Sequence, residues 1–195
     1  MDAASAKRLQ TKLGVGADGV IGRGTLAALF RYFGCPRERA DELALAGAVH
    51  MVEAAILDTP LRLAHFTAQL AHESDNFLAM EEYASGAAYE GRADLGNTEA
   101  GDGKRYKGRG PIQLTGRAGY RRVGRLIGID LERHPELVAY PSVGMQCACL
   151  YWTEHGLNAL ADNDDLLTIT KRINGGTNGL QDRQVKLAKA KALMS

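Results

Sequence analysis

The sequence has few of the residues that disulfide bonds and structural metal sites require. It has three cysteines, an odd number, and two of them stand together in Cys147-Ala148-Cys149. A zinc site built on such a pair needs a second pair of ligands, and none accompanies this one. We therefore expect Cys35, Cys147 and Cys149 to be reduced and partly buried, as in a protein made in a cytoplasm.

Long apolar runs and an excess of one charge are also missing. No stretch approaches the roughly 18–20 uninterrupted apolar residues of a membrane span, and residues 1–7 lack the apolar core of an export signal. The net charge of +1 excludes a global polycation. A local basic run over residues 104–109 either faces an anionic polymer or is a solvated loop. We expect no signal peptide, no stable membrane insertion and no nucleic-acid partner.

Most of the sequence shows the hydrophobic periodicity of α-helices. The 195 residues suffice for one well-buried core with a small appendage. Residues 5–34 predict a small helical unit, and the break at Pro36 places domain boundaries at 1–35 and 36–195. The mainly α fold rests on these expected helices: 38–57, 60–73, 116–128, 141–155, 164–174 and 180–194.

The helix that begins at Pro60 carries the first candidate catalytic acid. Asp58-Thr59-Pro60 is typical of a capped helix start with proline at the first position. An apolar stripe then runs to Glu73, after which Ser74-Asp75-Asn76 supplies poor helix formers. Glu73 is thus expected at the C-terminal end of a buried helix.

A second carboxylate is needed if water attacks a glycosidic bond, because one group protonates the leaving oxygen and another activates the water. Glu82 lies nine positions after Glu73. On one continuous helix the two would be rotated by roughly 900° and separated by about 13.5 Å, so they would point to opposite sides. They form a pair only if the chain turns back after Glu73. Glu81 and Glu90 compete with Glu82, and the residues alone leave the base undecided.

A glycine-rich, polar region over residues 83–110 predicts a long loop, which in a compact domain usually serves function. The loop over residues 108–116 follows it. If this piece is extended, Gln113 and Thr115 point to the same side and could orient a water and an acetamido group. A turn plus a short strand is the alternative.

Three motifs in order identify a family resemblance: Ala71-His72-Glu73-Ser74, the run Gly108–Thr115, and Ile173-Asn174-Gly175-Gly176. The chain resembles family 19 glycoside hydrolases, and among them phage endolysins of the chitinase-like class, over roughly residues 40–193. The resemblance implies a lysozyme-like, chitinase-like multi-helix domain whose cleft is formed by the glycine-rich loop region. Residues 9–25 also resemble half of a peptidoglycan-binding repeat; a helical hairpin packed on the main domain is the alternative.

Residue roles follow from this resemblance. It implies that Glu73 is the general acid, that Glu82 is the general base, and that Thr115 helps to hold the water. It implies these substrate-binding residues: Gln113, Tyr120, Asn174, Arg183, Tyr89 and Glu90. His72 is expected to be structural, and Gly119 stands where relatives often carry asparagine.

The function expected from the resemblance is that of an endolysin. It would cut the bond from N-acetylmuramic acid to N-acetylglucosamine in bacterial peptidoglycan by inversion, with the carboxyl groups about 6.5–9.5 Å apart. We expect a monomer without metal or organic cofactor, which accumulates in the host bacterial cytoplasm and reaches the wall through a separate holin-type pore. The alternatives are a chitinase acting on N-acetylglucosamine polymers and a non-catalytic wall-binding protein.

Overall fold

The computed structural model describes residues 1–194, which are mainly helical, with isolated β-bridges in place of a sheet. The mainly α fold that the sequence predicted is confirmed. The α-helices are α1 (Ala3–Lys12), α2 (Arg23–Tyr32), α3 (Arg37–Glu53), α4 (Pro60–Glu73), α5 (Asp102–Arg105), α6 (Arg117–Ile127), α7 (Pro141–Glu154), α8 (Leu157–Asp162), α9 (Leu166–Asn174) and α10 (Leu180–Met194). Short 3-10 helices are η1 (Ile56–Asp58), η2 (Ala87–Tyr89), η3 (Ala93–Leu95) and η4 (Pro135–Ala139).

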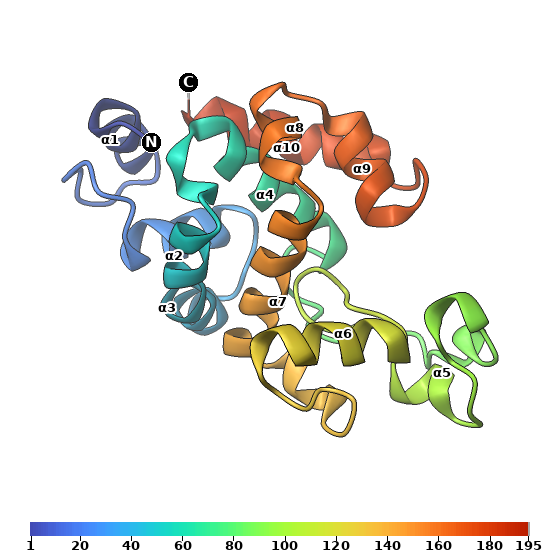
Figure 1. The fold of residues 1–195 in the computed structure, drawn as a ribbon. Coiled ribbons are helices and arrows are strands. Elements are labelled where there is room, and N and C mark those ends of the chain that lie inside the picture. Colours follow the sequence, from blue (N-terminus) through green and yellow to red (C-terminus); the bar gives the residue numbers. More distant parts are fainter. Residues whose placement is uncertain (195) are drawn as a thin grey trace.

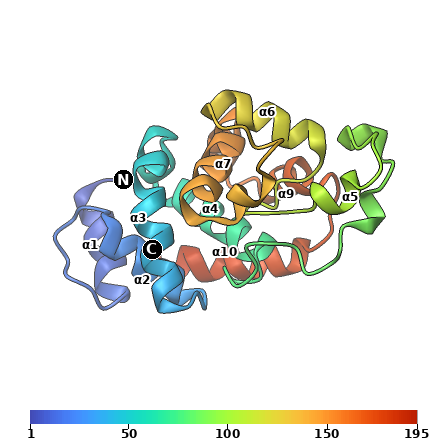
Figure 2. The same cartoon turned by 90° about the horizontal axis from the view of Figure 1, so that it is seen from below.

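Helix α4 lies in the middle of the molecule (Figure 1). It begins as the sequence predicts, because the Thr59 hydroxyl accepts a hydrogen bond from the Arg62 amide at 3.1 Å and Pro60 is its first residue. Every residue from 63 to 71 is buried. Helix α10 packs along α4, and Figure 2 shows the two side by side, with both chain termini on the side of α1.

Two hydrophobic clusters form the interior. The larger joins α2, α3, α4, α7 and α10 around buried residues such as Phe66 and Trp152. The smaller lies under α6 and includes Tyr106, Leu114 and Tyr120. Because Ile112 packs in the larger cluster and Leu114 in the smaller, the loop between them spans the boundary of the two. Residue 113 is therefore held where the two halves of the interior meet.

The N-terminal segment shares the larger cluster with the rest of the chain. Leu26, Leu29 and Phe30 are fully buried in it, and the Phe30 ring lies 5.0 Å from that of Phe77, centroid to centroid. The core thus crosses the expected boundary at Pro36. That residues 1–35 form a separate unit stays a prediction.

The motif noted in residues 9–25 has a structural role. The Gln10 amide donates to the Asp18 carboxylate at 2.7 Å and to the Thr25 hydroxyl at 3.1 Å, and its oxygen accepts from the Gly19 amide at 2.8 Å. Gln10 is 1% exposed, so these bonds satisfy a buried polar group. The pattern of these residues holds the turn between α1 and α2 together.

The three cysteines are free and buried, as predicted. Burial raises the pKa of Cys35 to about 11 and that of Cys147 to about 12, because an apolar environment disfavours a thiolate. These thiols are therefore unreactive at neutral pH. None of the helices in residues 1–194 combines the length and apolarity that crossing a bilayer requires.

Candidate functional site

A sharp chain reversal follows the first candidate acid. Helix α4 ends at Glu73, and Asp75, Asn76 and Phe77 then take left-handed backbone conformations with φ of 48°, 58° and 67°. Such conformations cost roughly 1–2 kcal/mol for each non-glycine residue, so they persist only where the surroundings fix them. The Ser74 hydroxyl helps by accepting from the Phe77 amide at 3.0 Å. The expected turn directly after Glu73 is confirmed.

Two further contacts hold this reversal. The Phe77 side chain is fully buried, and the Arg39 guanidinium donates to the carbonyl oxygen of Leu78 at 2.6 Å. The Ala79 amide then donates to the Ser74 carbonyl oxygen at 2.8 Å. This bond brings the segment that leads to Glu82 back to the end of α4.

Glu73 is paired with a buried cation. The Arg183 guanidinium, fully buried on α10, donates one hydrogen bond to the Glu73 carboxylate and another to the Gln69 side-chain oxygen. The Glu73 side chain is 15% exposed. Arg183, which the resemblance places among the substrate-binding residues, thus contacts the candidate acid. The sequence reasoning missed Gln69, although its spacing of one helical turn before Glu73 was a usable signal.

Glu82 has a different environment. Its carboxylate accepts from the Tyr89 hydroxyl at 3.1 Å and from the Gly108 amide at 3.1 Å, and no cationic side chain among residues 1–194 pairs with it. Burial, and then the charge of Glu82, raises the pKa of Tyr89. Tyr89 therefore stays a hydrogen-bond donor at neutral pH. The structure brings Tyr89, expected to bind substrate, to the candidate base.

The competing carboxylates are engaged elsewhere. Glu81 accepts from the Arg109 guanidinium at 2.9 and 3.0 Å and lies 3.4 Å from the Lys107 ammonium. The Glu90 carboxylate accepts from the amides of Gly101 and Gly103 at 2.6 and 2.8 Å. Glu90, expected to bind substrate, thus closes the glycine-rich loop. Among the three candidates for the base, the geometry favours Glu82.

The loop over residues 108–116 is not extended. Arg109 and Leu114 form an isolated bridge, and residues 110–113 make a turn in which Gln113 has a φ of 55°. Of the two alternatives that the sequence left open, the turn is the one observed, and the flanking residues Ile112 and Leu114 pack into two different clusters. Just after the turn, the Thr115 hydroxyl donates to the Gln113 carbonyl oxygen at 2.9 Å.

Gln113 and Glu82 nevertheless lie against the same glycine. A Cβ atom placed on Gly108 would stand 2.6 Å from the Gln113 side-chain oxygen and 3.3 Å from a Glu82 carboxylate oxygen. A larger residue there would displace the end of the Gln113 side chain. The Gln113 amide group also donates to the Gly110 carbonyl oxygen at 2.9 Å. The motif glycine thus leaves room for an amide oxygen and a carboxylate oxygen beside the same backbone position.

Tyr120 does not reach a surface where a sugar could bind. It is fully buried, and its hydroxyl donates to the Lys107 carbonyl oxygen at 2.8 Å and accepts from the Arg109 guanidinium at 3.1 Å. The expectation that Tyr120 binds substrate is corrected. Its position on α6 turns the ring into the smaller cluster, where it orients Arg109 toward Glu81.

The third motif approaches the end of α4. Asn174 is the exposed last residue of α9, and the loop after it passes His72 so closely that a Cβ on Gly179 would lie 2.3 Å from the imidazole. The His72 ring also bonds the Asp182 carboxylate at 2.6 Å. Burial raises the pKa of Asp182, but the bonds from His72 and Lys186 outweigh it and leave that pKa below its usual value. These contacts give His72 a structural role at the end of α4.

Comparison with known proteins fits this geometry. Residues 59–164, which include the reversal, both carboxylates and the turn, match the family described as class I chitinase, glycoside hydrolase family 19. The match covers more than half of the chain. The protein belongs to glycoside hydrolase family 19.

Individual relatives agree with that assignment. An endochitinase of Arabidopsis thaliana is 36% identical over 115 residues, which are 58% of this chain and 39% of that protein. A glycosyl hydrolase family 19 domain-containing protein of Haemophilus influenzae is 34% identical over 103 residues, 52% of this chain and 49% of that protein. The aligned part therefore spans half or less of the length of these relatives.

Solved structures share the fold. A chitinase C variant superimposes with a TM-score of 0.69 at 22% identity, covering 86% of this chain and 91% of the other. A class IV chitinase of Zea mays gives a TM-score of 0.61 at 20% identity, covering 98% of this chain and 92% of the other. The expected chitinase-like arrangement of helices is thus confirmed.

Proposed function

We propose that the protein hydrolyses a β-1,4-linked glycan with inversion, using Glu73 as the general acid and Glu82 as the general base. One observation carries the proposal: a single fixed reversal separates two carboxylates and gives them different partners. Glu73 contacts a buried cation, whereas Glu82 accepts from a hydroxyl and a backbone amide. Two carboxyl groups in distinct environments are what separate acid and base roles require.

Each group then has a definite task. Glu73 gives its proton to the leaving glycosidic oxygen, and Arg183 stabilises the carboxylate that remains. Glu82 removes a proton from the water that attacks the anomeric carbon from the opposite face. Thr115 and Gln113 help to hold that water and the substrate. Inversion requires the two carboxyl groups to stand about 6.5–9.5 Å apart, with the water between them.

The substrate that we propose is bacterial peptidoglycan, cut between N-acetylmuramic acid and N-acetylglucosamine during host lysis. Residues 89–117 resemble phage endolysins more than plant chitinases, which supports this substrate. The three free thiols, which suit accumulation in a host cytoplasm, support it as well. Release through a holin-type membrane pore and action as a monomer belong to the same proposal. Contact of residues 9–25 with wall polymer would extend it.

A chitinase activity on N-acetylglucosamine polymers is the second candidate. Its support is that relatives such as the Arabidopsis thaliana protein are named endochitinases. The two candidates share the mechanism and differ in whether the polymer carries muramic acid with its attached peptides. Hydrolysis of soluble chitin oligomers discriminates between them.

The deciding experiment is mass spectrometry of the fragments that the wild type and Glu73→Gln release from purified peptidoglycan. We expect fragments with N-acetylmuramic acid at the reducing end, and their loss in Glu73→Gln. Fragments that end in N-acetylglucosamine would change the bond that is cut but keep the mechanism. Cleaved peptides, or no products, would refute the proposal.

A further inference from the structure

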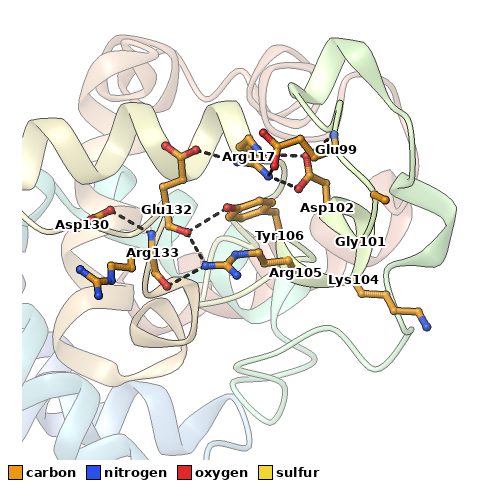
Figure 3. Close-up of a pocket in the computed structure, with 11 residues that line it drawn as sticks. Glu99, Gly101, Asp102, Lys104, Arg105, Tyr106, Arg117, Asp130, Glu132 and Arg133 are labelled. Carbon is orange, nitrogen blue, oxygen red and sulfur yellow. Dashed lines mark hydrogen bonds and ion pairs between the residues drawn. The ribbon is translucent and has the colours of Figure 1, made fainter.

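A large polar cavity lies apart from the carboxylate pair. Its volume is about 860 Å³, and it is formed by α5, the start of α6 and the residues around Glu132. Apart from Gly101, whose amide bonds Glu90, its lining residues do not belong to the candidate site described above. Four cationic and four acidic side chains line it, so both signs of charge are present (Figure 3). A cavity of this size and polarity calls for a polar occupant.

The inner part of the cavity is neutralised by its own ion pairs. Arg117 donates to both carboxylate oxygens of Asp102, at 2.5 and 2.9 Å, and to Glu132 at 3.1 Å. Asp102 is 1% exposed. These bonds hold the Asp102 pKa below and the Arg117 pKa above their usual values, so both groups stay charged and paired. Because these inner side chains already pair with one another, we do not expect them to bind a charged ligand.

The rim of the cavity carries cations of a different kind. Arg105 donates through one nitrogen to the carbonyl oxygens of Glu132 and Arg133, at 3.3 and 3.1 Å, which orients its guanidinium without neutralising it. Lys104, Arg105 and Arg133 have no carboxylate partner within 4 Å among residues 1–194. Figure 3 shows Lys104 and Arg133 at opposite ends of the drawn group. Carboxylates of a ligand could pair with all three.

Two exposed acids on the same rim narrow the choice of ligand. Glu99 accepts from the Arg117 guanidinium at 2.8 Å, yet its side chain is 70% exposed. Asp130, which accepts from the Arg133 backbone amide at 3.0 Å, is exposed as well. These carboxylates would repel a dense polyphosphate but attract an ammonium group. The alternation of signs therefore matches a short peptide that carries several carboxylates and a free amine.

The cavity is linked to the candidate site through the glycine-rich loop. Glu90 bonds the amide of Gly101 in the cavity wall and that of Gly103 two residues on, and the neighbouring Tyr89 bonds Glu82. A polymer that lies across Glu82 would thus present its side groups on the same loop region.

We propose that this cavity binds the peptide stems attached to the muramic acid residues of peptidoglycan. This inference rests on the proposed function, and it deepens it by giving the enzyme a means to prefer peptidoglycan over chitin, which carries no peptides. Lys104 and Arg133 hold stem carboxylates, and the acidic rim receives the free amine. The stem thereby anchors the glycan while hydrolysis proceeds at Glu73 and Glu82.

The test compares a rim variant, Lys104→Gln/Arg133→Gln, with a control of equal charge, Lys7→Gln/Arg37→Gln, on exposed positions outside the cavity. Both are assayed on intact peptidoglycan and on the same glycan after an amidase has removed the stems. We expect the rim variant to lose about tenfold in kcat/KM on intact peptidoglycan, through KM, because tenfold corresponds to the 1.4 kcal/mol that two exposed charge contacts can supply. On stripped glycan it should match the wild type.

A second measurement separates this proposal from the proposed function. Binding of the released stem peptide to Glu73→Gln is titrated calorimetrically, with and without the rim substitutions. Binding that the rim substitutions abolish and the control substitutions leave intact supports the stem site, whatever bond is cut. No binding, or an equal loss of activity on intact and stripped glycan, overturns it. If the enzyme acts on chitin oligomers alone, the peptidoglycan proposal is refuted. The titration then decides by itself whether the cavity binds the stem peptide.

Discussion

The Arg183 guanidinium, fully buried on α10, bonds the Glu73 carboxylate at the end of α4. An arginine in that position is stable only while an anion or another acceptor compensates its charge. The Glu82 carboxylate has no cationic partner among residues 1–194, so the two carboxylates should differ in what their removal does to the fold.

Glu73→Gln and Glu82→Gln should therefore separate catalysis from stability. Both should lower kcat by at least about 10²-fold, because each removes an acid or base function. Glu73→Gln should also lower the free energy of unfolding by about 1–3 kcal/mol, less than for a fully buried pair because Glu73 is partly exposed. Glu82→Gln should lower it by less than about 1 kcal/mol. Urea unfolding of both variants checks this, and equal losses would contradict the assigned environments.

Tyr89→Phe should reduce activity without unfolding the protein. It removes the hydroxyl that donates to Glu82 at 3.1 Å. A hydrogen bond to a charged group is worth about 1.5–3 kcal/mol, so kcat should fall by roughly 10-fold or more. Because the pKa of Tyr89 is raised, the wild type should keep this donor through mildly alkaline pH. Tyr83→Phe, on a side chain that is 77% exposed, is the control and should keep full activity.

His65 should make stability fall on acidification below neutral pH. It is fully buried on α4, with one ring nitrogen 2.8 Å from the Asp164 carboxylate, which Lys191 also contacts. Burial lowers the pKa of His65 and outweighs the attraction of Asp164. The unfolded chain, with a histidine pKa of about 6.5, thus binds the proton more readily.

The stabilising contribution is then complete above about pH 6.5 and is lost as pH falls through the lower folded pKa. Urea unfolding of the wild type between pH 7 and 5 should show the decline, and His65→Gln should flatten it. His134→Gln, on a side chain that is 52% exposed, should leave the pH dependence as it is. An unchanged slope in His65→Gln would show that another group is responsible.

Glu132 should make the stability of the fold depend on pH in a lower range than His65 does. Its hydrogen bonds from Arg121, and then from Arg117, hold its pKa at about 2. Because the folded pKa lies below the unfolded value of about 4.3, the stabilisation is complete above that value and is lost as pH falls through about 2. After allowance for solvent screening, Glu132→Gln should cost roughly 1–2 kcal/mol at pH 7 and only a small part of that at pH 2, where the folded carboxyl is about half protonated. Glu136→Gln is the exposed control in the same urea series.

Much of the candidate site could be predicted locally. Thr59-Pro60 fixes the start of α4, and the poor helix formers after Glu73 fix its end, because capping and helix propensity act within a few residues. The three motifs in order were enough to indicate the family. Each of these inferences needed only neighbours in the sequence.

The partners of those residues could not be predicted in this way. Tyr120 matches a substrate-binding position by its place in the sequence, yet the packing of α6 buries it completely. Glu90 resembles a candidate base, yet the loop folds so that two backbone amides take its carboxylate. Both outcomes depend on how distant segments pack, which no local pattern encodes.

The sequence by itself determined the helices, the break after Glu73 and the family, since hydrophobic periodicity, caps and turn residues act locally. Only the tertiary structure decided that Arg183, 110 positions away, compensates Glu73, and that the Tyr89 hydroxyl donates to the Glu82 carboxylate. The physical reason is that burial and charge pairing arise when α4, α10 and the glycine-rich loop come together around one core.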